Sequence, residues 1–277
     1  MAVQFTTTQK QRLIELDAPA DKLAACFGSQ EERNQGFATL QDELITKNKA
    51  LLQSLRDGLG RPLLRQMETQ LALALVEAGF VEVVTPATLA KEALYRMGID
   101  ETHPLWKQIF WLEDGRCLRP MLAPNLYALL SRLGKLWPAP IRIFEVGSCY
   151  RKESKGSCHL SEFTMLNLVE LGLENSPEQR LQELIALVMA KVGLEYQLVS
   201  EESEVYGQTV DVLIAGDLEA ASGTWGPHPL DEKWGITESW VGVGFGLERL
   251  TMVKGGFGQI RRVGRSLIYL DGARLNL

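Results

Sequence analysis

The stretch CYRKES at residues 149–154 closes an apolar segment that begins at Ile141 and has the composition of a strand. Side chains alternate along a strand, so the spacing predicts that Arg151 and Glu153 share one face. The planar guanidinium of arginine suits a phosphate, and a carboxylate can accept hydrogen bonds from an amino group. A surface ion pair has the same pattern, so this stretch indicates either a nucleotide contact or an exposed pair.

A second stretch, GVGFGLER at residues 242–249, is typical of a strand that runs directly into a helix. Glycine at every other position leaves one face of the strand without side chains, so a flat ligand can approach the backbone. Arg249 falls on the first turn of the helix, where it can stack on an aromatic plane. The run lacks the GxGxxG spacing and the early βαβ unit of a dinucleotide site. Close backbone packing is the alternative interpretation.

A third stretch, FTMLNLV at residues 163–169, is apolar on both faces, which indicates a central strand. Phe163, Met165, Asn167 and Val169 share one face, and Phe163 and Asn167 lie about 13 Å apart along it. That distance is about the reach from a nucleotide base to the side chain of an amino acid joined through a phosphate. A buried asparagine needs hydrogen-bond partners, which either the core or a ligand can supply.

The order of the expected elements predicts an α+β fold. Helices are expected over 8–17, 30–57, 63–78, 124–133 and 177–191, with another beginning at Leu247. Strands are expected over 80–84, 141–154, 162–170, 196–199, 208–214, 217–223 and 240–245. Long helices therefore precede short strands with hairpin-like links, which favours a mainly antiparallel sheet with helices packed on it. Gly58, Gly60 and Pro62 mark a candidate domain boundary.

The composition is that of a folded soluble protein, with 277 residues, 45% hydrophobic and 23% charged. The longest apolar runs, such as 184–190, are far too short to span a bilayer. The N-terminus shows no apolar signal segment, so a cytoplasmic protein without a membrane partner is expected. The four cysteines form no CxxC pair, which favours free thiols over a zinc site.

The charge is unevenly distributed along the chain. The net charge of -6 argues against a general nucleic-acid coat. Both ends are nevertheless basic, with Lys47 and Lys49 in the long N-terminal helix and Arg261 and Arg262 near the C-terminus. Such ends can bind a polyanion, although a solvated surface has the same composition.

Taken together, these stretches resemble a known family. The Arg-x-Glu strand, followed far downstream by the Gly-rich strand and its Gly-Leu-Glu-Arg helix start, resembles motifs 2 and 3 of class II aminoacyl-tRNA synthetases. The segment 63–86 resembles motif 1, the dimer element. The stretches RPMLAPNLY (119–127), CYRKES (149–154), EFTMLN (162–167), VYG (205–207), GDLE (216–219) and GFGLER (244–249) resemble the pyrrolysyl-tRNA synthetase family over nearly the whole chain.

The resemblance implies a class II synthetase-like antiparallel sheet flanked by helices and preceded by N-terminal helices. On this basis residues 61–277 are expected to form the catalytic domain and residues 1–60 a helical region that contacts tRNA. The implied reaction is activation of pyrrolysine with ATP and Mg²⁺, followed by transfer to the cognate tRNA.

The resemblance also implies a set of ATP contacts. Arg151 would grip the α-phosphate, Glu153 would meet the adenine amino group, and Phe163 and Arg249 would sandwich the adenine ring. Arg151 and Arg249 are the implied catalytic residues. The full ATP set is Arg151, Glu153, His159, Leu160, Phe163, Glu219, Ser222, Gly244 and Arg249. Of these, Glu219 and Ser222 would be the magnesium ligands, because this ion prefers hard oxygens.

The implied amino-acid pocket is a large apolar box that suits a long lysine side chain ending in a ring. Its residues are Ala123, Leu126, Tyr127, Leu130, Met165, Asn167, Val169, Tyr206, Trp240 and Gly242. Asn167 would bind the amide in the middle of the substrate side chain, and Tyr206 would close over the ring as a lid. Some of the apolar residues fit an ordinary core equally well.

Three partner predictions follow from the resemblance and the charge pattern. A homodimer is expected, with the apolar stripe Leu64, Met67, Leu71 and Leu75 in the motif 1 helix. The expected tRNA contacts are Lys47, Lys49, Arg261 and Arg262. Many family members carry an extra basic N-terminal tRNA-binding domain, which this sequence lacks, so a separate protein is expected to supply it.

Two other functions fit parts of the pattern. A class II synthetase for another bulky amino acid, such as phenylalanine, would leave a buried Asn167 without a side-chain amide to bind, at a cost of about 1–3 kcal/mol. A non-catalytic synthetase paralogue would not need Arg151, Glu153, Glu219 and Arg249 together.

Overall fold

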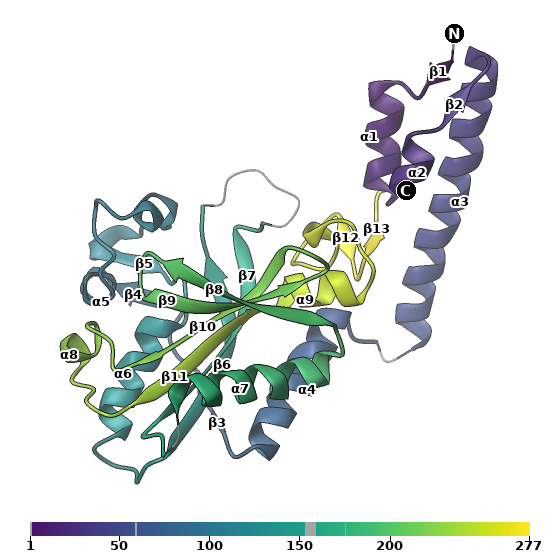
Figure 1. The fold of residues 1–277 in the computed structure, drawn as a ribbon. Coiled ribbons are helices and arrows are strands. Elements are labelled where there is room, and N and C mark those ends of the chain that lie inside the picture. Colours follow the sequence, from purple (N-terminus) through teal and green to yellow (C-terminus); the bar gives the residue numbers. More distant parts are fainter. Residues whose placement is uncertain (1, 59, 153–158, 175) are drawn as a thin grey trace.

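The computed structural model describes residues 2–58, 60–152, 159–174 and 176–277. Its centre is a seven-stranded sheet in the order β3-β6-β7-β11-β10-β9-β8 (Figure 1). The strands are β3 Val81–Glu82, β6 Ile141–Tyr150, β7 Glu162–Leu171, β8 Tyr196–Ser203, β9 Gly207–Ile214, β10 Leu218–Gly226 and β11 Trp240–Gly246. Neighbours pair antiparallel except β3 and β6, which are parallel. The predicted α+β fold with a mainly antiparallel sheet is confirmed.

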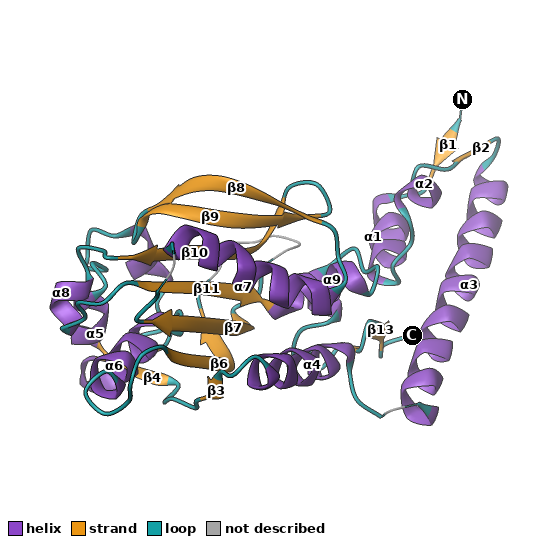
Figure 2. Ribbon diagram, turned by 60° about the horizontal axis from the view of Figure 1, so that its bottom comes forward, coloured by secondary structure: helices purple, strands orange, loops and turns teal. Residues whose placement is uncertain are grey.

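One face of the sheet is covered by three helices, α4 Leu63–Glu77, α7 Pro177–Val192 and α9 Leu247–Lys254 (Figure 2). Leu166 and Leu168 of β7 point to this face and pack in the same cluster as Leu71 of α4 and Leu184 of α7. Each fully buried side chain of this size contributes about 1.5–3 kcal/mol by removal from water. This face is therefore closed core.

The opposite face carries α5 Lys91–Arg96, α6 Ala123–Leu133 and α8 Asp231–Trp234. Val169 and Leu171 of β7 pack there with Tyr127 of α6 and Trp240 of β11. The small sheet of β4 Thr88–Ala90 and β5 Arg116–Leu118, together with the 3-10 turns Pro104–Gln108 and Glu113–Gly115, borders this layer. The alternation along β7 thus directs one set of side chains into the core and the other toward α6, as the sequence pattern predicts.

The N-terminal helices α1 Thr7–Glu15, α2 Ala20–Leu23 and α3 Gln30–Asp57 project away from the sheet (Figure 1). With the short strands β1 Val3–Gln4 and β2 Cys26–Phe27, they surround a separate core that includes Leu13, Leu16 and Leu40. Leu277, the last residue of the chain, packs against this core.

The C-terminal segment is tied to these helices. It contains the 3-10 turn Ile260–Arg262 and the hairpin β12 Tyr269–Leu270 and β13 Ala273–Arg274. The backbone N–H of Arg274 donates to Asn48 Oδ1 of α3 at 2.6 Å. The division at residue 60 stays a prediction, and the association of the two chain ends is a feature that the sequence analysis missed.

Several element boundaries differ from the predicted ones. β6 ends at Tyr150, so Arg151 follows the strand and does not lie on it, and Glu153 is outside the described residues. The backbone N–H of Arg151 still donates to the Ser161 carbonyl at 3.0 Å. β3 covers two of the five residues expected at 80–84, and β8 runs to Ser203. Across the described part of the chain, no helix is both long and apolar enough to cross a membrane.

Candidate active site

A cavity of about 610 Å³ opens over the sheet face that carries α6. It is lined by every residue of the predicted amino-acid pocket, and by all of the predicted ATP contacts except Glu153, which lies outside the described residues. Residues from β7, β10, β11, α6 and the β8–β9 turn meet there, although they are far apart in sequence. The lining proves that these residues share a cavity, and their roles toward ATP and amino acid remain proposals.

The Gly-rich strand β11 forms part of the cavity wall. Gly242, Gly244 and Gly246 all line the cavity. A Cβ atom at Gly244 would approach the Met165 Cε atom to 3.1 Å and the Asn167 Nδ2 atom to 3.6 Å. The absent side chains therefore leave space on the cavity side of the strand, as the alternate-glycine interpretation requires.

The cavity side of β7 presents Phe163, Met165, Asn167 and Val169. Asn167 is half-buried, and its side chain forms no hydrogen bond with any other residue that the structure describes. The amide is thus not held by a partner in the described core. With respect to the described residues, it is an unpartnered donor and acceptor on an otherwise apolar wall.

Two arginines line the cavity, Arg151 directly after β6 and Arg249 on the first turn of α9 after β11. The Arg151 guanidinium lies 5.4 Å from the centroid of the Phe163 ring, and its Nε donates to the Pro120 carbonyl at 2.9 Å. The Arg249 Nη1 donates to the Glu219 carbonyl at 2.7 Å and lies 3.8 Å from the Glu219 Oε1. Both positive charges are therefore positioned by protein contacts.

Glu219 and Ser222 are three residues apart, so on a regular strand they would point to opposite faces. A β-bulge between Glu219 and Ala221 shifts the register of β10 on β9, and both residues line the cavity. Burial raises the pKa of the Glu219 carboxyl, while Arg249 opposes this shift and Asp211 adds to it. The described residues hold no cluster of three or more acidic, histidine or cysteine side chains suited to a metal. Two oxygen donors suit an Mg²⁺ ion that is held mainly by substrate phosphates.

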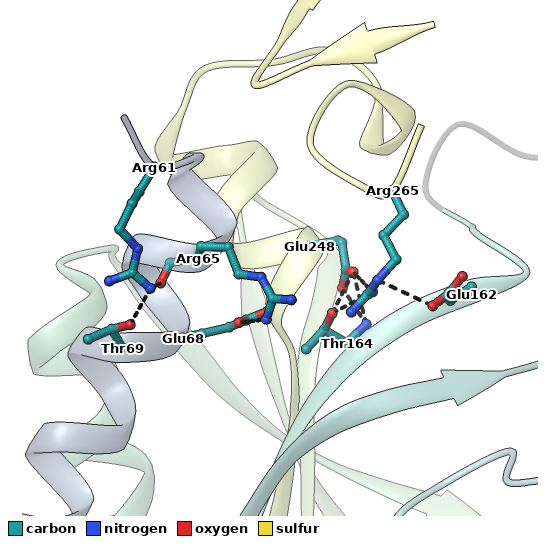
Figure 3. A network of polar contacts seen from close by, with 8 residues as sticks. All are labelled: Arg61, Arg65, Glu68, Thr69, Glu162, Thr164, Glu248 and Arg265. Carbon is teal, nitrogen blue, oxygen red and sulfur yellow. Dashed lines mark hydrogen bonds and ion pairs between the residues drawn. The ribbon is translucent and has the colours of Figure 1, made fainter. Parts of the chain in front are cut away.

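Glu248, next to Arg249, forms a buried network that the sequence analysis did not assign (Figure 3). It is 1% exposed, and its carboxylate accepts hydrogen bonds from the Thr164 backbone N–H at 2.8 and 2.9 Å and from the Thr164 hydroxyl at 2.9 Å. Arg265 donates to the Thr164 Oγ1 at 3.0 Å and lies 3.2 Å from Glu162. Burial raises the pKa of Glu248, opposed by its bonds to Thr164 and by Arg265. The network joins the start of α9 to β7 between Phe163 and Met165.

The predicted tRNA contacts divide into two groups. Lys47, Lys49 and Arg261 are exposed. Arg262 is only 2% exposed, donates to the Glu15 carbonyl at 3.2 Å and lies over the Tyr269 ring. The prediction that Arg262 contacts tRNA is wrong, because its guanidinium is used inside the protein to join the C-terminal segment to α1.

A second cavity of about 530 Å³ lies where the C-terminal segment meets α1. Arg261, Arg265 and Arg274 line it, and His159 and Leu160 line both cavities. Glu15 also lines it and pairs with Arg274 at 2.7 Å. The basic character of the C-terminus is thus concentrated beside the main cavity.

The apolar stripe assigned to a dimer contact lies inside the chain. Leu64, Met67, Leu71 and Leu75 are buried against the sheet with α7 and α9. The prediction that these four residues form the subunit contact is wrong, because the helix uses them for its own core. The exposed apolar residues on α4 and near β3 are instead Leu73, Val76, Val81 and Val84, with Val84 90% exposed.

Comparisons with known proteins agree with this geometry. The family model described as "tRNA synthetases class II core domain (F)" matches residues 49–270. Curated O-phosphoserine--tRNA(Cys) ligases of Methanococcus vannielii and Methanocorpusculum labreanum are each 24% identical, over 198 and 184 residues. These matches take in 66% and 62% of this chain, but only 36% and 34% of the relatives, so the chain spans about a third of their length. The chain therefore has the fold of a class II synthetase core.

Solved structures give a narrower match. The crystal structure of pyrrolysyl-tRNA synthetase from Desulfitobacterium hafniense is 50% identical, with a TM-score of 0.94 and full coverage of both chains. A structure of PylSc, a pyrrolysyl-tRNA synthetase of the same organism, is 50% identical with a TM-score of 0.92, covering 100% of this chain and 96% of that one. The chain belongs to the pyrrolysyl-tRNA synthetase family of class II aminoacyl-tRNA synthetases.

Proposed function

We propose that this protein activates pyrrolysine with ATP to form its adenylate and then transfers the amino acid to its cognate tRNA. The observation that carries the proposal is one cavity in which the predicted ATP contacts other than Glu153 meet an apolar pocket. Within the described residues, the Asn167 side-chain amide in that pocket has no hydrogen-bond partner. Family membership supports the same reaction class, that of an aminoacyl-tRNA ligase.

The proposed chemistry is acyl activation by displacement at phosphorus. The amino-acid carboxylate attacks the α-phosphate of ATP, and pyrophosphate leaves with the bonding electrons. Because the carboxylate is already an anion, this step needs no general base. The contribution of the protein is then to position the two substrates and to neutralise charge.

The proposed ATP site uses the two arginines differently. Arg151, held by the Pro120 carbonyl, would neutralise the α-phosphate, while its neighbour Phe163 offers a flat face for adenine. Arg249, held by the Glu219 carbonyl, would cover the opposite face of the ring. Glu153 is proposed for the adenine amino group on the resemblance alone.

Mg²⁺ is proposed to bind with the triphosphate. Glu219 and Ser222 fit this ion, because the β10 bulge turns both oxygen-bearing side chains into one cavity. When bound, the ion neutralises charge on the phosphates. The Glu219 side chain is half-exposed beside Arg249, so a polyphosphate can reach this part of the cavity.

The amino-acid end of the cavity supports a long substrate with a polar centre. Its walls are apolar, from Leu126, Tyr127, Val169 and Trp240, with Asn167 as the polar exception. An Nε-acyl lysine places its amide partway along the side chain, where it can pair with Asn167. Phenylalanine has no such group and would leave the asparagine unpaired, which a polar site rejects strongly.

The test is amino-acid-dependent pyrophosphate exchange with purified protein, ATP and Mg²⁺. Pyrrolysine or a ring-bearing Nε-acyl lysine should support exchange, and phenylalanine should not. Preferential exchange with phenylalanine would instead favour another class II specificity. No exchange with any amino acid in folded protein would favour a non-catalytic paralogue.

Three partner assignments belong to the same proposal. The cognate tRNA would contact the exposed basic residues Lys47, Lys49 and Arg261. A homodimer would form through α4 and β3, where exposed Leu73, Val76, Val81 and Val84 lie near an edge strand of the sheet. A cytoplasmic location and a separate tRNA-binding protein are proposed from the same family resemblance.

A further inference from the structure

A buried carboxylate, Asp231, lies beneath the amino-acid end of the cavity. It is 5% exposed, and none of the residues that the structure describes forms an ion pair with it. Its Oδ1 accepts from the Tyr127 hydroxyl at 3.2 Å, and its Oδ2 accepts from the Trp240 Nε1 at 2.8 Å and the His228 backbone N–H at 2.7 Å. Burial raises the pKa of the Tyr127 hydroxyl, which therefore stays protonated as a donor. One carboxylate thus fixes two aromatic walls of the pocket and the loop that carries His228.

His228 connects this carboxylate to the β8–β9 turn. The Leu230 backbone N–H donates to the His228 Nδ1 at 3.1 Å, so the Nδ1 has no hydrogen and the Nε2 carries it. The Nε2 then donates to the Tyr206 carbonyl at 3.0 Å. The rings of His228 and Tyr206 also meet edge to face, with centroids 5.7 Å apart. The backbone of the turn is therefore held by the His228 imidazole through its Nε2.

The turn closes the end of the pocket that is far from Phe163. The Tyr206 ring meets the Trp240 ring at 6.4 Å between centroids, and both residues line the cavity. The Trp240 indole leans over Gly242, where a Cβ would lie 3.4 Å from its Cζ3, and Gly242 pairs with Val169 across the ladder. The cavity therefore runs along β7 from Phe163 past Asn167 to Val169, and the Tyr206 and Trp240 rings lie at its far end. Only a side chain that extends past Asn167 reaches them.

We propose that His228 is a positioning residue that holds the Tyr206 turn over the far end of the amino-acid pocket, and that Asp231 anchors it there. This rests on the proposed function, and it assigns selectivity for large ring-bearing Nε-substituents to two residues that line no part of the cavity. Lysines with short Nε-acyl groups end before the turn, so their binding does not depend on this contact.

A matched pair of variants separates the two hydrogen bonds of the imidazole. In His228→Asn, the side-chain oxygen replaces Nδ1 and can accept from Leu230, but nothing reaches the Tyr206 carbonyl. In His228→Gln, the side-chain amide nitrogen replaces Nε2 and can donate to Tyr206, but the Leu230 bond is lost. Pyrophosphate exchange is measured for both variants with Nε-acetyl-lysine and with a cyclopentyloxycarbonyl-lysine, at varied amino acid and at varied ATP.

His228→Asn is expected to raise KM for the ring-bearing lysine about 3- to 10-fold, the effect of one lost hydrogen bond. The KM for Nε-acetyl-lysine and for ATP should change by less than about 2-fold. His228→Gln should keep a KM near that of the unsubstituted protein. The ratio of the two lysine efficiencies within one protein does not depend on the folded fraction, so partial misfolding cannot imitate the result.

Two results would overturn the inference. The first is a ratio of the two lysine efficiencies that is unaltered in His228→Asn, or an equal loss of efficiency for the ring-bearing lysine in His228→Asn and His228→Gln. Either result would mean that the imidazole only supports its own loop. If the unsubstituted protein exchanged pyrophosphate with no lysine derivative, the proposed function would fall, and this inference with it. If the unsubstituted protein exchanged pyrophosphate and His228→Asn left the ratio of the two lysine efficiencies unaltered, the role of His228 would be refuted while the proposed function would stand.

Discussion

Asn167 is the polar side chain on the otherwise apolar cavity side of β7, and we propose that it selects the substrate. Its neighbours on the cavity side of β7 are Met165 and Val169, and its side chain has no hydrogen-bond partner among the described residues. When a ligand fills the cavity and displaces its water, an amide that the ligand leaves without a partner is costly. We therefore expect Asn167 to favour ligands with an amide at that depth of the pocket.

Asn167→Ala is expected to lower kcat/KM for an Nε-acyl lysine about 10- to 100-fold, because the substrate amide loses about 1–3 kcal/mol of binding. Phenylalanine analogues should gain, most of all when Val169 is also made smaller, since the unpaired amide is gone and space opens. Steady-state pyrophosphate exchange with both substrate classes measures the change. An unaltered efficiency for the acyl lysine, in a folded variant, would show that Asn167 only packs.

Glu248 makes a pH-dependent contribution to stability that can be predicted in sign. Burial raises its pKa above the ordinary 4.5, so the folded protein binds this proton more readily than the unfolded chain. The stabilisation is complete at pH values below the ordinary pKa of the carboxyl. It is lost as pH rises through the raised pKa of Glu248 in the folded protein.

Glu248→Gln removes this titration while keeping the shape of the side chain. The free energy of unfolding of the unsubstituted protein, minus that of the variant, should therefore fall as pH rises from about 4 to about 7. Urea unfolding at several pH values measures this difference. A difference that is constant, or that rises with pH, would contradict the assignment.

At the scale of elements, the joint between β7 and α9 determines how the two proposed ATP contacts face each other. Phe163 is on β7 and Arg249 is on the first turn of α9, and Glu248 holds the two elements together through Thr164. Thr164 is buried, so its hydroxyl acts on substrate only through this joint.

Thr164→Val keeps the shape of the side chain but removes the hydroxyl that binds Glu248 and Arg265. We expect the KM for ATP to rise about 3- to 10-fold, because Arg249 is held less exactly, while the KM for the amino acid changes little. Pyrophosphate exchange at varied ATP and varied amino acid separates the two constants. Thr164→Ser retains the hydroxyl and is the matched control. If the KM for ATP and the KM for the amino acid rose equally, Thr164 would contribute only to general packing. An equal rise of the KM for ATP in Thr164→Val and Thr164→Ser would lead to the same conclusion.

For the whole molecule, the exposed apolar residues of α4 and the segment around β3 predict a dimer. Leu73 and Val84 are 59% and 90% exposed. Replacing both by glutamate should convert the protein to a monomer of 30.9 kDa, because charges at the centre of an apolar contact lose their water. Light scattering at micromolar protein measures the mass.

The control is Leu267→Glu, because Leu267 is exposed on the C-terminal segment; this change should leave the mass unchanged. A monomeric unsubstituted protein with full activity would contradict the dimer.

The basic ends predict how tRNA affinity depends on salt. Reversing Lys47, Lys49 and Arg261 together should weaken tRNA binding and reduce the slope of log affinity against log salt by about 0.7–0.9 for each lost phosphate contact. Pyrophosphate exchange should hardly change, because these residues lie outside the main cavity. Lys135→Glu, at an exposed position after α6, is the control. Equal losses of binding and exchange would mean that the three charges are structural.

The sequence alone predicted the fold class and, for two strands of the candidate site, which residues share a face. Period-two alternation along 163–169 predicted that Phe163, Met165, Asn167 and Val169 share one face of β7, and the structure places that face on the cavity. The alternate glycines of 242–246 likewise predicted a bare strand face. These are local rules of backbone geometry, so they hold before any tertiary contact forms.

Tertiary structure decided what local rules could not. The stripe on α4 was correctly apolar, but only packing against the sheet determined that it is core and leaves Leu73 and Val84 outside. Arg262 counted as a free charge in the sequence, yet its contacts with α1 bury it, because the C-terminal segment returns to the first helices. Asp231 and His228 gave no signal at all, since their partners are Tyr127 of α6, Trp240 of β11 and Tyr206 of the β8–β9 turn. Charge and polarity can be read from a sequence, but the partner that satisfies them is chosen by the fold.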